Sequence, residues 1–414
     1  MKNKITLFIC LLLITAMILA GCSSSVNLME GIKPNNEMGS ETMDEKLNQA
    51  ILNFTWNMFK ECSGNEGNLM ISPPSVYFAL AMAANGADGE TKTEMMKALN
   101  VENISMDYLN KGLNYWMNSI TKDRIAKFSI ANSIWYREGF KANKDFLQAN
   151  ADYYSAHIHS LDFTQKSAPN TINDWVKKAT NDKIDKIVEE ISDDLVMYII
   201  NAIYFNGDWK YEFSANKTHE AAFNAPHGEM KTDFMSRRGE MDYLKSNGTT
   251  GVILPYLDEQ FAFVGLLPEE GHTPRDLINN LTALDLLNLM KNKEEKNMEL
   301  SIPKFESSYE DSLIDELSNM GMKLPFEPYN ADFSKMNESR AKDLFIGDVK
   351  HKTYIRVDEK GTEAAAVTSI GVNTTSMPIE LPLLAFDRPF VYGIVDVTTG
   401  IPLFIGIMEN PAIK

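Results

Sequence analysis

The sequence predicts an α+β fold in which one large domain follows an N-terminal export segment. Its 414 residues are 44% hydrophobic and 23% charged, a composition that provides a substantial core for a globular protein. Patterns typical of amphipathic helices and of buried strands both occur, with the strands gathered late in the chain. We find no internal repeat and no Pro- or Gly-rich break after residue 45, so we expect residues 45–414 to form one domain.

The first residues predict a signal peptide. Lys2 and Lys4 precede an apolar run over residues 5–19, which is short for a membrane span and typical of a signal-peptide core. The box that ends at Cys22, Leu-Ala-Gly-Cys, resembles the cleavage site of bacterial lipoproteins, in which the cysteine thiol receives a diacylglycerol. We therefore expect residues 1–21 to be removed and Cys22 to carry lipid; the alternative is a cleaved signal without lipid.

The segment after the cleavage site predicts a tether. Residues 22–44 are rich in Ser, Gly, Asn and acidic residues, which is typical of a flexible linker with a reach on the order of 25 Å. We expect a protein anchored on the extracytoplasmic face of a bacterial membrane, or released to the extracellular space. Because Cys10 leaves with the signal and Cys22 is acylated, Cys62 remains alone, and no disulfide within the mature chain is expected.

The domain is expected to open with helices. An amphipathic pattern predicts a helix over Leu47–Glu61. A short strand over Asn68–Ser72 is expected to lead into a helix at Pro73, with Ser72 as its N-cap. Thr91 and Glu94 have the spacing of a capping box, which predicts that a further helix begins there and extends through Leu99.

A later helix is expected to pack on a sheet. Thr171 and Asp174 are candidates for its start, and apolar residues follow at helical spacing: Ile172, Trp175, Val176 and Ala179. By contrast, the mixed charges of Lys291–Glu299 predict a solvated loop.

The clearest strand covers Leu195–Phe205, an almost continuous apolar run that predicts burial on both faces. Its polar interruption, Asn201, must be hydrogen-bonded, because a buried amide without partners costs roughly 1 to 3 kcal/mol. Further strands are expected at Val252–Pro255, Phe261–Leu267, Met298–Pro303, Thr353–Val357, Phe390–Val395 and Pro402–Ile407.

We find no motif for catalysis, a metal or a cofactor. No Gly-x-Ser-x-Gly elbow or phosphate-binding glycine loop is present in the sequence. We therefore predict that the protein is not an enzyme. Cys62 is interpreted as a small core residue, and the pair His157 and His159 as structural in preference to a metal site. The net charge of −17 argues against nucleic acid as a partner.

The segment from Glu359 to Ala366 has unusual properties. Gly361 allows a pivot, and beyond it the residues alternate so that Thr362, Ala364 and Ala366 share one uncharged face, whereas Glu363 and Ala365 share the other. Such a segment is acceptable both as an exposed loop and as a central strand. The alternative is a linker or the start of an Ala-rich helix with Thr362 as N-cap.

Over residues 45–414 the chain resembles the serpins, a family of serine protease inhibitors. The matching blocks occur in order along the chain: Asn68 to Ser75, Ala131 to Ser133, Ile172 to Val176, Asn201 to Trp209, Leu254 to Tyr256, Pro303 to Phe305, His351 with Lys352, Glu359 to Ala366, and Arg388 to Phe390. The resemblance implies three β-sheets, a large sheet A among them, about eight or nine helices, and an exposed reactive loop at about residues 359–380. It also implies that a protease cleaves this loop and is held as the acyl-enzyme while the loop inserts into sheet A.

The same resemblance assigns site residues. Ser72, Ser75, Asn201 and His351 correspond to the shutter beneath sheet A, and Lys304, Trp209 and Glu359 to the breach, where the loop first inserts. Glu359, Gly361 and Thr362, with Glu363, Ala364, Ala365 and Ala366, correspond to the hinge of the loop.

Counting seventeen residues from Glu359, the usual number in the family, assigns the reactive bond to Thr375 and Ser376, with Thr374 and Met377 as alternative registers. These small, uncharged residues suit an elastase-like or subtilisin-like serine protease; whether cysteine proteases are also inhibited stays open. We expect a monomeric inhibitor. The alternative is a serpin-fold binding or carrier module that never traps a protease.

Overall fold

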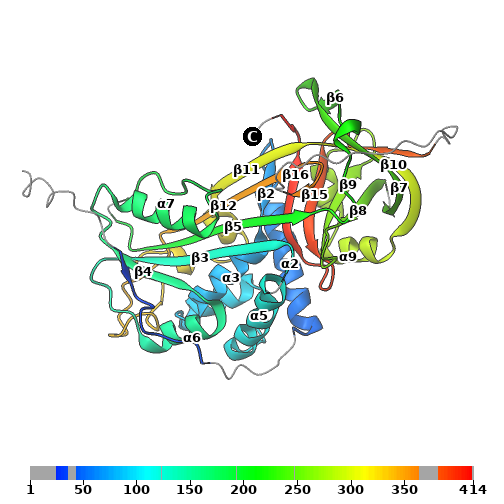
Figure 1. Cartoon of the computed structure of the whole chain (residues 1–414). Helices are drawn as coiled ribbons and strands as arrows, with labels where there is room; N and C mark the ends of the chain where they lie inside the picture. The colour runs from blue at the N-terminus through cyan, green and yellow to red at the C-terminus, as the bar shows by residue number, and fades with distance from the viewer. Residues whose placement is uncertain are drawn as a thin grey trace, which may run out of the picture.

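The computed structural model describes residues 25–35, 43–122, 124–192, 194–246, 248–362 and 381–412, and confirms an α+β fold. Within these residues the α-helices are α2 (Glu45–Cys62), α3 (Pro73–Ala84), α4 (Gly89–Ala98), α5 (Met106–Thr121), α6 (Lys144–Tyr154), α7 (Ala168–Ala179), α8 (Pro274–Asn280), α9 (Ala283–Lys291) and α10 (Ile314–Asn319). Two short 3₁₀ helices cover Ala215–Lys217 and Leu324–Phe326. Most helices lie on one side of the larger strands, and α7 lies across the other side (Figure 1).

Seven strands form the sheet that corresponds to the expected sheet A. In spatial order they are β1 (Val26–Asn27), β4 (His157–Leu161), β3 (Lys127–Arg137), β5 (Met197–Asp208), β13 (Gly361–Thr362), β12 (Asp348–Val357) and β11 (Phe305–Ser312). The central strand β5 is buried along almost its whole length, as its apolar run predicts.

The other strands form a second, nine-stranded sheet. Its path is β14 (Leu383–Ala385), β10 (Glu294–Pro303), β7 (Gly228–Ser246), β8 (Thr249–Pro255), β9 (Phe261–Pro268), β15 (Phe390–Asp396), β16 (Pro402–Met408) and β2 (Leu69–Ile71), with β6 (His219–Ala225) paired to β7. The long strand β7 pairs with β6 along its first part, with β10 along its middle part and with β8 at its end. The second and third of the three expected sheets are therefore joined through β7.

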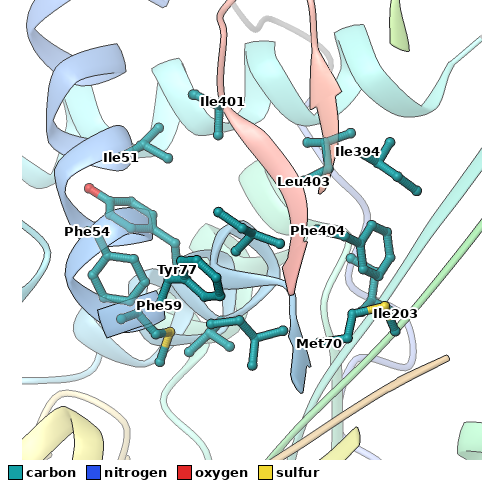
Figure 2. Close-up of a cluster of buried hydrophobic side chains, with 14 of the residues drawn as sticks. Ile51, Phe54, Phe59, Met70, Tyr77, Ile203, Ile394, Ile401, Leu403 and Phe404 are labelled. Atoms are coloured by element: carbon teal, nitrogen blue, oxygen red, sulfur yellow. The ribbon is translucent and has the colours of Figure 1, made fainter. Parts of the chain in front are cut away.

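Two hydrophobic cores hold the layers together. In the main core, side chains of α2 and α3 pack against β15 and β16, and Figure 2 shows Phe54 and Tyr77 on the helices near Leu403 and Phe404. A second core, on the opposite face of sheet A, packs α7 against β3 and β5 through Ile172, Val176 and Trp135. Helix α7 thus covers one face of sheet A, the sheet into which the loop is expected to insert.

Two expected helix starts and one expected N-cap hydrogen bond differ from the structure. α4 begins at Gly89, so Thr91 lies inside the helix, where its hydroxyl accepts a hydrogen bond from the Asp332 backbone. Ser72 is at the N-cap position of α3 but makes no side-chain cap, because its hydroxyl donates to the Leu403 carbonyl instead. α7 begins at Ala168, a turn before Thr171.

Two predicted flexible segments also differ from the structure. Lys291–Glu299 contains the end of α9 and the first part of β10, which pairs with β7 from Glu294 onward. Residues 25–35, expected within a flexible tether, lie against sheet A and α6: Val26 pairs with Ser160 of β4, and the Asn35 backbone donates to Asp152 of α6. In both cases backbone pairing orders a segment whose side chains gave no strand signal.

Candidate functional site: the opening of sheet A

A buried polar network lies beneath the centre of sheet A. Asn201 and His351 are opposite each other on β5 and β12, and both are fully buried, as are Ser72 and Ser75 at the start of α3. Asn201 Oδ1 accepts from the Ser75 hydroxyl at 2.7 Å and contacts His351 Nδ1 at 2.6 Å. The residues predicted for the shutter are therefore brought together by three separate parts of the chain, the start of α3, β5 and β12.

The hydrogen bonds define the protonation of His351. Its Nε2 accepts from the Ser72 backbone N–H at 3.0 Å, so the proton resides on Nδ1 and is donated to Asn201. Burial lowers the pKa of His351 to about 3, and the ring is neutral at physiological pH. The Asn201 side-chain amide also donates a hydrogen bond to Asn132 on β3. The sequence did not reveal Asn132 as a partner because β3 was not predicted as a strand.

A second group of residues surrounds the end of β5. Lys304 Nζ lies 3.0 Å from the Glu359 carboxylate, which also accepts from the Thr218 hydroxyl at 2.8 Å. Burial of Glu359 acts to raise its pKa, but the hydrogen bonds from Thr218 and Lys304 outweigh it and hold the pKa below its ordinary value. The ion pair therefore persists at neutral pH.

Trp209 secures the same region through the backbone. Its indole N–H donates to the Asp358 carbonyl at 2.9 Å, and its backbone N–H donates to the Lys360 carbonyl at 2.7 Å. The indole ring stacks on Tyr256 with 4.7 Å between ring centres. The segment that leads to the loop is thus fixed on both sides of Glu359.

The hinge residues Gly361 and Thr362 form β13, which lies between β5 and β12. These strands are paired in parallel from Asp348 with Tyr198 to Tyr354 with Tyr204. Beyond that point β13 lies between them: Thr362 pairs with Gly207 of β5 and with Val357 of β12. Sheet A is therefore already open at one end.

Thr362 and Gly361 fit this opening closely. Thr362 is fully buried, and its hydroxyl is 2.6 Å from the Tyr256 hydroxyl. A Cβ added at Gly361 would lie 2.1 Å from the Gly207 carbonyl oxygen. Gly361 does not adopt a positive φ, so it is needed for close approach and not for the free pivot that the sequence suggested. Tyr256 belongs to the block Leu254 to Tyr256, one of those that resemble the serpins, but the sequence gave no indication of its contact with Thr362.

Several predicted residues lie outside the described part of the chain. They are Cys22, the hinge residues Glu363 to Ala366, and the reactive-bond candidates Thr374, Thr375, Ser376 and Met377. Of the other candidates, Cys62 is buried and burial raises the pKa of its thiol. His159 stacks on Trp135 with 4.4 Å between ring centres, and within the described residues no group of three or more His, Cys, Asp or Glu side chains is arranged to hold a metal. Across the same residues, no helix is long and apolar enough to span a membrane.

Comparisons with known proteins agree with this architecture. The family model "Serpin (serine protease inhibitor)" matches residues 49–411, so the chain belongs to the serpin family. A serpin-like protein of Thermococcus kodakarensis is 34% identical over 379 residues, covering 90% of this chain and 87% of that protein. Human neuroserpin is 28% identical, covering 88% and 91% of the two chains.

Solved structures show the same fold. The thermophilic serpin tengpin in its native state superimposes with a TM-score of 0.88 at 38% identity, covering 94% of this chain and all of that one; its latent state gives 0.78 over 89% and 99%. Thyroxine-binding globulin with bound thyroxine shares the fold at 24% identity, with a TM-score of 0.81 over 88% and 99%.

Proposed function

We propose that this protein is an irreversible suicide-substrate inhibitor of serine endopeptidases. The observation that supports this most directly is β13, whose Thr362 lies buried between β5 and β12. The remainder of the loop has a continuous path into sheet A from that point, provided that the seven register pairs between β5 and β12 separate.

The chemistry follows from the fate of the acyl-enzyme. The protease serine Oγ attacks the carbonyl carbon of Thr375, the bond to Ser376 breaks, and the new amine of Ser376 leaves with a proton. The part of the loop that ends in the Thr375 ester is then free to insert between β5 and β12. Insertion moves the attached protease away from the geometry in which water would hydrolyse the ester.

The proposed roles of the site residues follow the same sequence of events. Lys304, Glu359 and Trp209 hold the end of sheet A at which insertion begins, and Gly361 and Thr362 begin it. Ser72, Ser75, Asn201 and His351 hold β5 and β12 together further along, because Asn201 and His351 face each other across the strand pair that must separate. We place the target among elastase-like or subtilisin-like enzymes because Thr374, Thr375 and Ser376 are small and uncharged.

We further propose that the protein is exported and anchored through a lipid on Cys22. This proposal is supported by the order of charged residues, apolar run and Leu-Ala-Gly-Cys box at the N-terminus.

A second candidate function is that of a non-inhibitory carrier. A cavity of about 600 Å³ between α2, α9 and the second sheet favours it, with Leu52, Leu284, Met290 and Val397 among its lining residues. Thyroxine-binding globulin, which shares the fold, binds a small molecule. The cavity is compatible with either function, whereas the position of Thr362 between β5 and β12 favours loop insertion.

Incubation with an elastase distinguishes the two functions. An inhibitor forms a complex with the protease that survives denaturing gel electrophoresis at close to one-to-one stoichiometry, and mass spectrometry of the released peptide locates the cut. Proteolysis of the loop without any stable complex, across elastase-like and subtilisin-like enzymes, would favour the carrier.

A further inference from the structure

The N-terminal strand β1 extends sheet A at the edge formed by β4. Val26 pairs with Ser160 and Asn27 with His159, and the Leu28 backbone N–H donates to the Ile158 carbonyl at 2.8 Å. Further along, Gln148 donates to the Lys33 carbonyl at 2.9 Å. Only two residues belong to the strand itself, and Val26 is 56% exposed, so β1 is held by few contacts.

The register of sheet A locates β1 relative to the hinge. Crossing the sheet from Val26, the paired residues are Ser160 on β4, Tyr136 on β3 and Met197 at the start of β5. The hinge strand β13 pairs with Gly207 and Asp208 at the other end of β5. The dark blue strand in Figure 1 is β1, and it lies at the end of sheet A far from β8 and β9.

The same register gives the level that an inserted loop would reach. β13 runs antiparallel to β5, so each further residue of the loop would lie one residue nearer the start of β5. Residue 372 would then lie opposite Met197, level with Val26, and Thr375 opposite Asp194. The two chains are separated at this level by four strand spacings, or about 19 Å.

A protease joined to Thr375 through its active-site serine is wide enough to reach β1 when its body lies on the β4 side of the inserted strand. A chain of about 220 residues has a radius of gyration of about 17 Å, which corresponds to a sphere about 22 Å in radius. We propose that β1 and a trapped protease compete for this end of sheet A, so that trapping displaces β1 from β4. This inference rests on the proposed inhibitory function and identifies a surface that the trapped serine protease occupies.

Displacement of β1 would change how the protein is tethered. Ser25 is three residue steps from Cys22, a span of at most about 11 Å, so docked β1 would keep a lipid on Cys22 close to the end of sheet A. Release of residues 25–35 would let the segment before α2 act as the longer linker that its composition predicts. The trapped protease would gain room between the inhibitor and the membrane.

Hydrogen exchange tests the displacement. The chain from residue 22 with Cys22→Ala is compared in three forms: intact, in covalent complex with elastase, and cut in the loop by a metalloprotease, which forms no acyl-enzyme. We expect amides of residues 26–28 to exchange at least tenfold faster in the complex, and at the intact rate in the cut form. A stable complex with unchanged exchange would overturn this inference alone, whereas failure to form any complex would overturn the proposed function and this inference with it.

A reversible lock provides the second test. Val26→Cys with Ser160→Cys joins directly paired residues, whose Cβ atoms in such a pair lie about 4.5 to 5.5 Å apart. In the oxidised form we expect the number of inhibitor molecules consumed per trapped protease to rise at least fivefold, and reduction should restore the original value. The gain in thermal stability on metalloprotease cleavage should be the same in both forms, because the loop still inserts. Equal stoichiometry in the oxidised and reduced forms would contradict the competition.

Discussion

Asn201 holds its place in β5 through hydrogen bonds with three side chains, those of Ser75, Asn132 and His351. Replacing it by Ala leaves several of these buried groups without partners, at roughly 1 to 3 kcal/mol each. We expect Asn201→Ala to lower the free energy of unfolding by about 3 kcal/mol in urea denaturation. Asn103→Ala, at an exposed position, is the matched control and should change it by less than about 0.5 kcal/mol. Equal small effects at both positions would contradict the structural role of the network.

The buried ring of His159 makes stability depend on pH. Within the described part of the chain, neither ring nitrogen has a hydrogen-bond partner, and burial, with the neighbouring His157, lowers the pKa of His159 to about 4. In the unfolded chain the ring takes up a proton below about pH 6.5. Between pH 6.5 and 4 the unfolded state therefore binds more protons, and stability is lost as pH falls, by up to about 1.4 kcal/mol per pH unit.

His159→Phe removes this effect and keeps the stacking on Trp135. We expect the variant to be at least as stable as the parent protein at pH 7.5 and to lose less stability between pH 6.5 and 4.5. Urea midpoints measured across this range check the expectation, and parallel pH curves would contradict it.

At the scale of residues, the sequence predicted that Asn201 must be hydrogen-bonded, but it did not identify all of the hydrogen-bond partners in the site. An amide in an apolar run had to be hydrogen-bonded, and the family resemblance supplied Ser75 and His351. Asn132 and Thr218 were missed because their contacts come from strand pairing and chain folding that no local pattern around them indicates.

At the scale of elements, the proposed trapping mechanism depends on the opening between β5 and β12. Thr362→Arg puts a charge at a fully buried position, which is costly without a partner. We expect the variant to be cleaved at the parent rate but to consume at least tenfold more inhibitor per trapped protease. Thr362→Ser keeps the hydroxyl that faces Tyr256 and should trap normally. Full trapping by the Arg variant would show that Thr362 does not lie on the inserting face.

The elements that the sequence predicted best are those buried by their own apolar residues. β5, β9, β15 and β16 were expected within a few residues of their observed limits, because burial on both faces leaves an unbroken apolar run. The first half of β10 was missed because its charged side chains lie on an exposed strand that is ordered by backbone pairing. β1 was missed because a strand of two residues leaves no alternating pattern in the sequence. The start of α4 was misplaced because Thr91 accepts a hydrogen bond from the distant Asp332 backbone. The start of α3 was predicted correctly, but Ser72 makes no side-chain cap because its hydroxyl donates to the Leu403 carbonyl.

At the scale of the whole molecule, the anchor proposal has a direct test. Cys22→Ala removes the thiol that would carry the diacylglycerol, so the variant should move from the membrane fraction to the soluble fraction of the producing cells. Cys62→Ala, at a buried cysteine, should leave the distribution unchanged. A Cys22 variant that stays with the membranes would contradict lipid anchoring.

The central claim is that the intact chain is less stable than its loop-cleaved form. About 14 inserted residues, each gaining hydrogen bonds worth roughly 0.5 to 1.5 kcal/mol, would stabilise the cleaved protein by on the order of 10 kcal/mol. That amount is similar to the total stability of an ordinary domain. It would be sufficient to separate β5 from β12 and to displace the weakly held β1.

Thermal unfolding before and after a single cut near Thr375 measures this difference most directly. We predict that the cut protein unfolds on the order of 20 °C above the intact one. Superimposable unfolding curves would contradict the account, because they would mean that the cleaved loop gains nothing by inserting into sheet A.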